Sequence, residues 1–331
     1  MGKTFKILSI DGGGIKGLYS SKIIEHFEEE FNCNMADHFD MICGTSTGGI
    51  LALALSLNIK ASKISDLYIN HGPKIFPWQP KFIGILKQIL FCGKFSDKNL
   101  RNALEETFKK KKIKDSNCLL CIPSYSLTDA KPFIFKYDHK EGNLSRDNQT
   151  LYVDVALATS AAPTYFPLAE LKKYDNKQFV DGGIYANNPS LVGFIEALTY
   201  FVGDGKEFDE VKILSISSLT NSSGKITGIN RFRSFRHWRN DLFEAMLTGQ
   251  AKFNDYFMSK INDINSIPVT HVRVPSEILS PEQQNIVQLD KATKASIDLL
   301  KGKGNDMGVI WRKRPEVQDF FKSKKKYKLK K

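Results

Sequence analysis

The first sixty residues alternate between short apolar runs and glycine-rich turns. The apolar run at residues 5–10 breaks into glycines after Asp11, and residues 20–32 then carry apolar side chains at helical spacing. A second run, residues 39–43, leads through another glycine turn into an almost wholly apolar stretch, residues 50–59. Uninterrupted apolar runs are typical of buried parallel strands, and an apolar helix must lie inside a protein. We therefore expect two consecutive strand–helix units.

The same alternation continues along the chain. Further strands are predicted at residues 119–127, 132–137, 178–183, 211–217 and 270–275, and helices at residues 100–108, 151–162, 190–200 and 239–261. Strands that alternate with helices indicate an α/β fold, here a three-layer sandwich with a mainly parallel central sheet covered by helices. Without an internal repeat or a flexible linker, one domain is expected over residues 1–305, followed by a tail over residues 306–331.

The tail concentrates the positive charge. The net charge is +12; residues 312–331 hold ten Lys or Arg against Glu316 and Asp319, which is +8 and leaves +4 on residues 1–311. Such a run is typical of a disordered, solvated tail, and the alternative is a contact with anionic lipid or nucleic acid. We expect a disordered tail and no stable nucleic-acid complex.

Cysteine use and hydropathy indicate a cytoplasmic protein. The five cysteines are scattered and follow no leader segment, so a reducing compartment is expected. Cys118 and Cys121 form a lone C-x-x-C in a strand-like run, which favours burial over zinc or redox chemistry. The longest apolar run, residues 50–59, is shorter than the ~20 residues that span a bilayer. A membrane would therefore be met from one side.

The first glycine turn, "DGGGIKG", admits two interpretations. Its glycines satisfy the G-x-G-x-x-G pattern of dinucleotide-binding folds. That pattern also needs an acid at the carboxyl end of the next strand, whereas Asp37 and Asp40 precede that strand. A dinucleotide site is therefore the less favoured interpretation.

The second interpretation is an oxyanion site. The backbone N–H groups of Gly12, Gly13 and Gly14 are unshielded at a helix N-terminus, where they can stabilise the negative charge that develops on an attacked ester carbonyl. Lys16 adds a positive charge nearby. Three glycines bordered by Asp11 and Lys16 are unusual for an ordinary strand-to-helix turn, and Gly17 is the last glycine of the motif.

The second turn, "GTSTG", places Ser46 between Gly44 and Gly48. G-x-S-x-G between a strand and a helix holds a nucleophilic serine in a strained, exposed elbow, although glycine and serine also form ordinary turns. An α/β-hydrolase would need His237 or His271 as its base and several strands before the elbow. Only 45 residues precede Ser46, so a histidine triad is not expected.

The third turn offers another base. Asp181 ends a strand-like run and is followed by Gly182 and Gly183, which allow a close approach of neighbouring groups. A carboxylate at this place can accept the serine proton directly. Taken alone, Asp-Gly-Gly is an ordinary turn, and its weight comes from occurring together with the other two motifs.

These motifs resemble those of the patatin-like phospholipase family. The resemblance rests on residues 11–17, 44–48 and 158–167 and on "DGG" with the following "YANNP", residues 181–183 and 185–189, in matching order, and covers about residues 5–220. It implies a patatin-like catalytic domain with a Ser46–Asp181 dyad, an oxyanion hole made by the glycines of the first turn, and neither a metal nor a cofactor. Lys16 stands where the family usually has arginine. Lysine keeps the positive charge but lacks the planar fork of donors that arginine presents.

The resemblance also implies an activity. We expect a serine esterase of phospholipase A type that cleaves ester-linked fatty acids from glycerophospholipids through an acyl-enzyme, at the cytoplasmic membrane face. Some bacterial relatives are nucleotide-activated anti-phage effectors that degrade membranes, so a regulatory nucleotide is the first alternative. A second alternative is a non-catalytic module that binds lipid or nucleic acid.

Two aromatic segments are candidate contacts. Residues 74–95 combine lysines with an apolar helical face, so Trp78, Phe82 and Leu86 are predicted to meet a membrane interface or to pack on the core as a lid. Residues 231–240 interleave arginines with aromatic residues, a mixture that could bind a nucleotide or nucleic acid. The three-residue spacing of those aromatics favours the buried stripe of a helix that continues to Met246.

Overall fold

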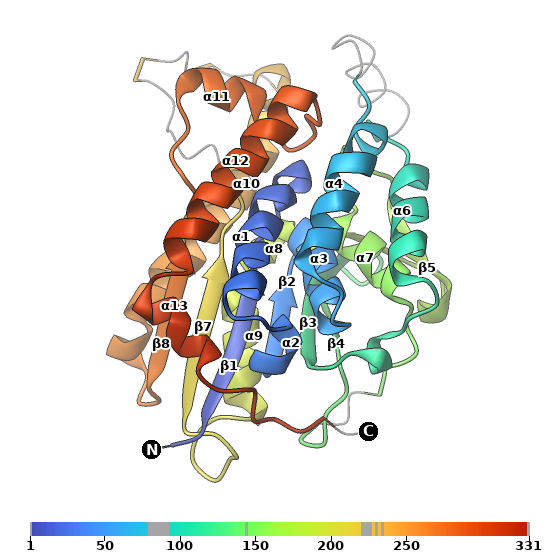
Figure 1. Ribbon diagram of the computed structural model, residues 1–331. Helices are drawn as coiled ribbons and strands as arrows, with labels where there is room; N and C mark the ends of the chain where they lie inside the picture. Colours follow the sequence, from blue (N-terminus) through green and yellow to red (C-terminus); the bar gives the residue numbers. More distant parts are fainter. Residues whose placement is uncertain are drawn as a thin grey trace.

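The computed structural model describes residues 2–78, 93–142, 145–219, 227–228, 231–232 and 235–329. In this part of the chain, helices cover both faces of one sheet (Figure 1). The strands are β1 (Thr4–Ile10), β2 (Met41–Gly44), β3 (Leu119–Ser126), β4 (Lys131–Lys136), β5 (Ala169–Leu171), β6 (Lys177–Asp181), β7 (Glu210–Ile216) and β8 (Val269–Val274). The α-helices are α1 (Gly17–Glu30), α2 (Met35–His38), α3 (Thr47–Ser56), α4 (Ala61–Ile75), α6 (Lys98–Phe108), α7 (Tyr152–Ser160), α8 (Gly183–Ala186), α9 (Ser190–Tyr200), α10 (Phe235–Ile264), α11 (Pro281–Ile286), α12 (Lys294–Trp311) and α13 (Pro315–Phe321), with 3-10 turns η1 (Gly14–Lys16), η2 (Ile113–Asp115) and η3 (Lys172–Tyr174).

The sheet is mixed, with a parallel centre. Its order is β5-β6-β3-β2-β1-β7-β8, and β4 also pairs with β3. Strands β1, β2, β3, β7 and β8 run in one direction, whereas β4 and β6 are antiparallel to β3. The predicted α/β sandwich is confirmed, as are all seven strands that the sequence predicts; only the three-residue β5 was not expected.

The pairing of β3 brings two distant segments together. Residues 119–121 of β3 pair with β2, and residues 124–126 pair with β6. Asp181, the last residue of β6, lies opposite Ser124 and therefore just beyond the end of β2. The turn after β2 carries Ser46, so the topology alone brings serine and aspartate to the same end of the sheet.

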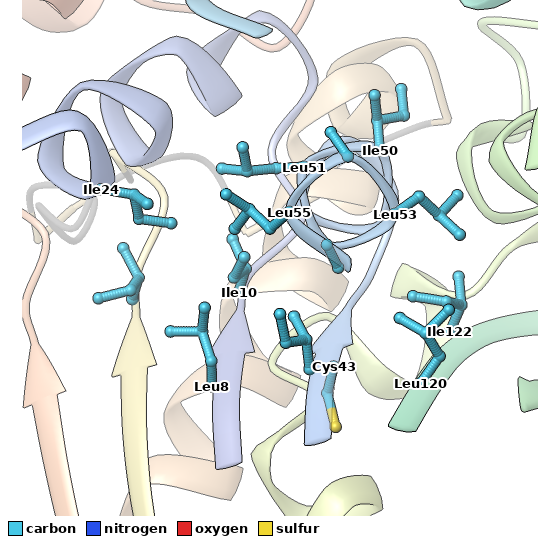
Figure 2. Packing of buried hydrophobic residues seen from close by; sticks show 14 of the residues in the cluster. Leu8, Ile10, Ile24, Cys43, Ile50, Leu51, Leu53, Leu55, Leu120 and Ile122 are labelled. Atoms are coloured by element: carbon cyan, nitrogen blue, oxygen red, sulfur yellow. The ribbon is translucent and has the colours of Figure 1, made fainter. Parts of the chain in front are cut away.

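Helix α3 forms the centre of the core. Every residue from Thr47 to Ser56 is buried, as the almost continuous apolar pattern predicts. Figure 2 shows the helix lying over the strands, with Leu55 above Ile10 of β1 and Leu53 directed toward Ile122 of β3. Burial of one such leucine contributes about 1.5–3 kcal/mol to stability. The turn that carries Ser46 is therefore anchored to a rigid helix.

The C-terminal segment is ordered, so the expectation of a disordered tail is wrong for the described residues up to 329. Helix α12 continues to Trp311, and α13 packs Phe321 against Phe31 with ring centroids 4.1 Å apart. Phe320 and Tyr327 are also buried. The expectation of disorder rested on the charge of this segment and not on its apolar residues, which anchor it while most of its lysine side chains remain exposed.

Helix α10 is longer than expected, and its buried face differs from the predicted one. Leu242 and Met246 are about two-fifths exposed, as is Trp238, so the prediction of a core stripe is wrong for them. Leu247 and Met258 are buried instead. Residues 233 and 234 of the aromatic and basic segment over residues 231–240 lie outside the described residues.

In the described part of the chain, no helix is both long and apolar enough to cross a bilayer.

Candidate active site

Ser46 occupies a strained turn between β2 and α3. Its backbone has φ 55° and ψ −125°, in the positive-φ region that residues other than glycine rarely adopt. The turn closes tightly against the neighbouring chain: a Cβ on Gly48 would lie 2.4 Å from the Ile10 carbonyl oxygen. The geometry matches the predicted elbow, and a strained turn of this kind marks a functional position.

The turn is held in place by α7. The Ser46 N–H donates to Thr159 Oγ1 at 3.0 Å, and the Thr159 hydroxyl donates to the Pro123 carbonyl of β3 at 2.6 Å. Ser124 reinforces this junction, because its hydroxyl contacts the carbonyl oxygens of Ala158 and Val180. The threonine of the "ATSAAP" motif thus positions the Ser46 turn, a role that the sequence reading left open.

Asp181 is the buried carboxylate that faces Ser46. Its Oδ1 accepts the Gly183 N–H at 2.7 Å. Burial raises the pKa of Asp181 to about 6, and the nearby Ser46 hydroxyl and the Gly183 N–H partly oppose this rise because both favour the ionised carboxylate. A carboxylate with a pKa near 6 is a better proton acceptor than an ordinary aspartate and is still ionised at pH 7.

The first glycine turn lies beside these two residues. Gly13 and Gly14 line the same pocket as Ser46. Gly14 has φ 60°, and a Cβ there would lie 2.1 Å from the Leu289 carbonyl oxygen, so this position requires glycine. The Gly12 N–H, however, donates to the Asn187 carbonyl at 3.0 Å, so the structure does not support Gly12 as an oxyanion donor.

A buried ion pair supports this turn from behind. Arg273, on β8, donates through Nη2 to Asp11 Oδ2 at 2.5 Å and through Nη1 to Oδ1 at 3.2 Å. Arg273 also donates to the Ser215 hydroxyl at 2.5 Å. Burial raises the pKa of Asp11, and the charge of Arg273 opposes that rise. The sequence reading identified Asp11 but not Arg273, which lies 262 residues away along the chain.

Lys16 is also buried behind the glycine turn. It lines a small second pocket together with Glu244, Gly12 and Gly13. Burial lowers the pKa of Lys16, and the charge of Glu244 opposes the change. Lys16 therefore lies near the predicted oxyanion position without lining the main pocket.

A largely apolar pocket opens at Ser46 and Asp181. Its walls come from the first glycine turn, the Ser46 turn and helices α4, α6 and α10. Aromatic and aliphatic side chains supply most of the lining: Ile50, Leu67, Tyr68, Ile75, Phe76, Leu100, Tyr165, Phe166, Phe243, Leu247 and Leu289. Such a pocket suits a hydrocarbon chain whose ester group lies at the serine.

Comparison with known proteins assigns the family. The profile of the family described as "Patatin-like phospholipase" matches residues 8–192, which contain both Ser46 and Asp181. A "cGAMP-activated phospholipase" of Pseudomonas aeruginosa is 30% identical, over 91% of this chain and 87% of that protein. The chain belongs to the patatin-like phospholipase family.

Two further relatives cover different shares of this patatin-like phospholipase. A "cGAMP-activated phospholipase" of Vibrio cholerae is also 30% identical and covers 96% of this chain and 94% of its own. "Patatin-like protein 2" of Oryza sativa subsp. indica is 32% identical, over 62% of this chain and 56% of that protein. The family assignment implies carboxylic ester hydrolysis.

The remaining predicted residues have distinct positions. Gly17, Gly44, Gly182 and Gly183 all lie at close approaches, where a Cβ would come within 3 Å or so of a neighbouring atom. Trp78, beyond the end of α4, is 81% exposed, whereas Phe82 and Leu86 lie outside the described residues. The described residues contain no group of three or more His, Cys, Asp or Glu side chains suited to a metal ion.

Asn187 is a pocket residue whose importance the sequence reading did not recognise. Its backbone carbonyl accepts the Gly12 N–H, and its side chain, 2% exposed, lines the pocket beside Ser46. The side-chain Oδ1 is buried and has no hydrogen-bond partner among the described residues. The signal was present in the "YANNP" that follows Asp181, but two adjacent asparagines also fit an ordinary turn.

Proposed function

We propose that this patatin-like phospholipase releases fatty acids from glycerophospholipids by a phospholipase A reaction. The main supporting observation is the juxtaposition of a strained serine turn, a buried carboxylate with a raised pKa and an apolar pocket. Each feature occurs in proteins for other reasons. Together they match what acyl transfer requires.

The reaction proceeds in two steps. Asp181 accepts the hydroxyl proton while Ser46 Oγ attacks the ester carbonyl carbon, and the backbone N–H groups of Gly13 and Gly14 stabilise the oxyanion. The lysophospholipid leaves as an alcohol after taking the proton from Asp181. Water then attacks the acyl-enzyme with Asp181 again as base, which releases the fatty acid and regenerates Ser46.

The substrate enters from a membrane surface in this proposal. Phe76 lines the acyl pocket, and Trp78, two residues further along the chain, is exposed. An exposed tryptophan at a pocket mouth suits the interface between headgroups and acyl chains. A Trp78→Ala variant should lose more activity on phospholipid vesicles than on a soluble short-chain ester. Equal losses on both substrates would contradict the interfacial contact.

Lipid mass spectrometry tests the reaction. Wild-type protein incubated with mixed phospholipid vesicles should release free fatty acids and an equal amount of lysophospholipid. Ser46→Ala should release neither, whereas Ser259→Ala, which removes an exposed hydroxyl on α10, should match the wild type. Undiminished fatty-acid release by Ser46→Ala would exclude the proposed chemistry.

A regulatory nucleotide is the second part of the proposal. The relatives from Pseudomonas aeruginosa and Vibrio cholerae are named cGAMP-activated phospholipases and match more than nine-tenths of this chain. Their similarity supports a nucleotide-activated effector that degrades membranes from the cytoplasmic side. Fatty-acid release measured with and without cGAMP, a cyclic dinucleotide, tests this part: stimulation is expected, and equal rates would exclude activation by cGAMP.

A further inference from the structure

A second large opening lies far from the active site, beneath the C-terminal segment. It is an open groove of about 1760 Å³. One wall is formed by the chain around η2 and the end of β4, and the other by residues 325–329. In Figure 1 the C-terminal segment crosses the lower end of the sheet to reach this place. One wall of the groove is therefore built by residues that the sequence alone assigned to a disordered tail.

The groove is basic on both walls. Lys114 lines one wall, and Lys326 and Lys328 line the other. In the described part of the chain, no carboxylate lies within salt-bridge distance of these three ammonium groups. Asp138 is the one acid in the lining, and Lys325 is already bonded to the carbonyl oxygens of Ala36 and Asn117. Positive charges on two facing walls suit a ligand with more than one phosphate group.

The position of the groove favours a soluble ligand over a membrane. Ser46 and Asp11 follow the carboxyl ends of β2 and β1. The groove residue Asn117 precedes β3, and the C-terminal segment bonds Asp40, directly before β2. Because β1, β2 and β3 are parallel, the groove lies at the amino end of the sheet, opposite the acyl pocket. A flat membrane at the pocket mouth would not reach it.

The groove is bonded to both elements that flank the nucleophile. Asp40 accepts the backbone N–H groups of Lys326 and Tyr327 at 2.8 and 2.7 Å and leads directly into β2. Asn117 donates its backbone N–H to the Ser56 carbonyl at 2.7 Å, at the end of α3. Ser46 lies between β2 and α3, so a ligand that moves the groove walls acts on both elements that position it.

We propose that this groove is the regulatory site for a cyclic dinucleotide, whose phosphodiesters contact Lys114 on one wall and Lys326 and Lys328 on the other. The assignment rests on the nucleotide activation proposed above. It names the groove residues, which no similarity to a relative identifies, and it places the regulator at the opposite end of the sheet from the ester.

Binding of cGAMP measured by isothermal titration calorimetry tests the assignment. The groove variant Lys326→Glu/Lys328→Glu should bind at least about tenfold more weakly than wild type, because each lost contact to a phosphate involves a charged group. The control Lys260→Glu/Lys294→Glu makes the same change in net charge at exposed positions outside the groove and should bind within about twofold of wild type. Thermal denaturation checks that each variant is folded. Lys114→Glu, on the facing wall, is the second groove variant and should also bind more weakly.

The possible outcomes distinguish a wrong groove assignment from a wrong proposal of nucleotide activation. Equal affinity in wild type and both groove variants would place the nucleotide elsewhere and overturn the groove assignment, while nucleotide activation would stand. No binding of cGAMP, cyclic di-AMP or cyclic di-GMP to wild type would overturn both, while Ser46-dependent hydrolysis would be unaffected. Loss of binding to phosphatidylglycerol vesicles with unchanged cGAMP binding would identify the groove as a lipid contact and contradict the assignment.

Discussion

Two buried aspartates at opposite ends of the sheet have different environments. Asp40, at the amino end, accepts three backbone N–H groups, from Lys6, Lys326 and Tyr327, at 2.7–2.8 Å. Asp181, at the carboxyl end, accepts one backbone N–H, from Gly183, and the Ser46 hydroxyl lies near enough to favour its ionised form. Burial raises the pKa of both carboxyls.

In the proposed mechanism, the difference separates a structural carboxylate from a reactive one. Both oxygens of Asp40 are engaged by backbone groups that fasten the C-terminal segment to β1 and β2, and Asp40 does not line the acyl pocket. Asp181 lines that pocket together with Ser46, whose hydroxyl can give up its proton. A raised pKa therefore does not identify a catalytic group by itself; the partners of the carboxylate do.

The largest expected effect is on Asp181. Asp181→Asn removes the base, so kcat/KM for a soluble ester should fall by about 10²–10⁴-fold.

The Asp181→Asn variant should also be at least as stable as wild type at pH 7. Burial raises the folded-state pKa of the Asp181 carboxyl above its unfolded-state pKa of about 4. The stability that this carboxyl contributes is therefore fully present below about pH 4 and is lost as the pH rises through about 6. Ester kinetics and urea unfolding measure the two effects. Full activity in Asp181→Asn would remove the distinction between the two aspartates.

The next largest effect is expected at Arg273. Arg273→Met leaves Asp11 buried without its cation, which should cost about 3–5 kcal/mol of unfolding free energy and disturb the glycine turn. Arg101→Met is the matched control, because Arg101 is paired with Asp154 at 3.9 Å on the surface and should cost less than about 1 kcal/mol. The double variant Asp11→Asn/Arg273→Met should recover part of the stability. Equal losses of unfolding free energy for Arg273→Met and Arg101→Met in urea would show that the buried Asp11–Arg273 pair does not stabilise the glycine turn.

Asp40→Asn should affect stability rather than chemistry. Asparagine offers one acceptor oxygen and turns an NH₂ donor toward backbone N–H groups, which should cost about 2–3 kcal/mol. The C-terminal segment should become more accessible to hydrogen exchange, because two of its N–H groups lose their acceptor. Unchanged unfolding free energy and unchanged exchange over residues 320–329 would show that Asp40 does not fasten this segment.

The smallest effect is the pH dependence of the reaction. Asp181 must be ionised to accept the Ser46 proton, so kcat/KM for a soluble ester should be constant above pH 7 and fall about tenfold per unit below pH 6. Measurement between pH 5 and pH 8, with thermal denaturation at each pH to confirm folding, provides the profile. A profile that stays flat to pH 5 would mean that burial does not raise the pKa of the catalytic base.

The turns that carry Ser46 and Asp181 could be predicted from the sequence because their signals are local. The three glycine turns each follow an apolar strand, and Ser46 and Asp181 stand at fixed places within them. Strands β1 and β2 are parallel and bring the first two turns to one end of the sheet, whereas Asp181 reaches that end on β6, which is antiparallel to β3. Each turn could be recognised as a candidate from its own residues, before any contact between the turns was known.

The amino end depends on long-range contacts that no local pattern shows. Lys6 of β1 donates to the Phe320 carbonyl at 2.9 Å across 314 positions, and this contact orders a segment that its lysine content made appear disordered. Helix α12 was missed for a similar reason. Its glycines weaken a helix prediction, yet Gly304 and Gly308 allow close packing on α1, where a Cβ would lie 2.8 Å from Lys22 or Tyr19 and 2.4 Å from His26.

Labelling with a fluorophosphonate tests the central claim, that Ser46 is the nucleophile and Asp181 its base, most directly. The reagent forms a stable adduct with an activated serine, which peptide mass spectrometry locates. We predict one adduct on the peptide that contains Ser46 in wild type, a much slower reaction in Asp181→Asn and no adduct in Ser46→Ala. A stoichiometric adduct on a different serine, with ester hydrolysis retained in Ser46→Ala, would contradict the account.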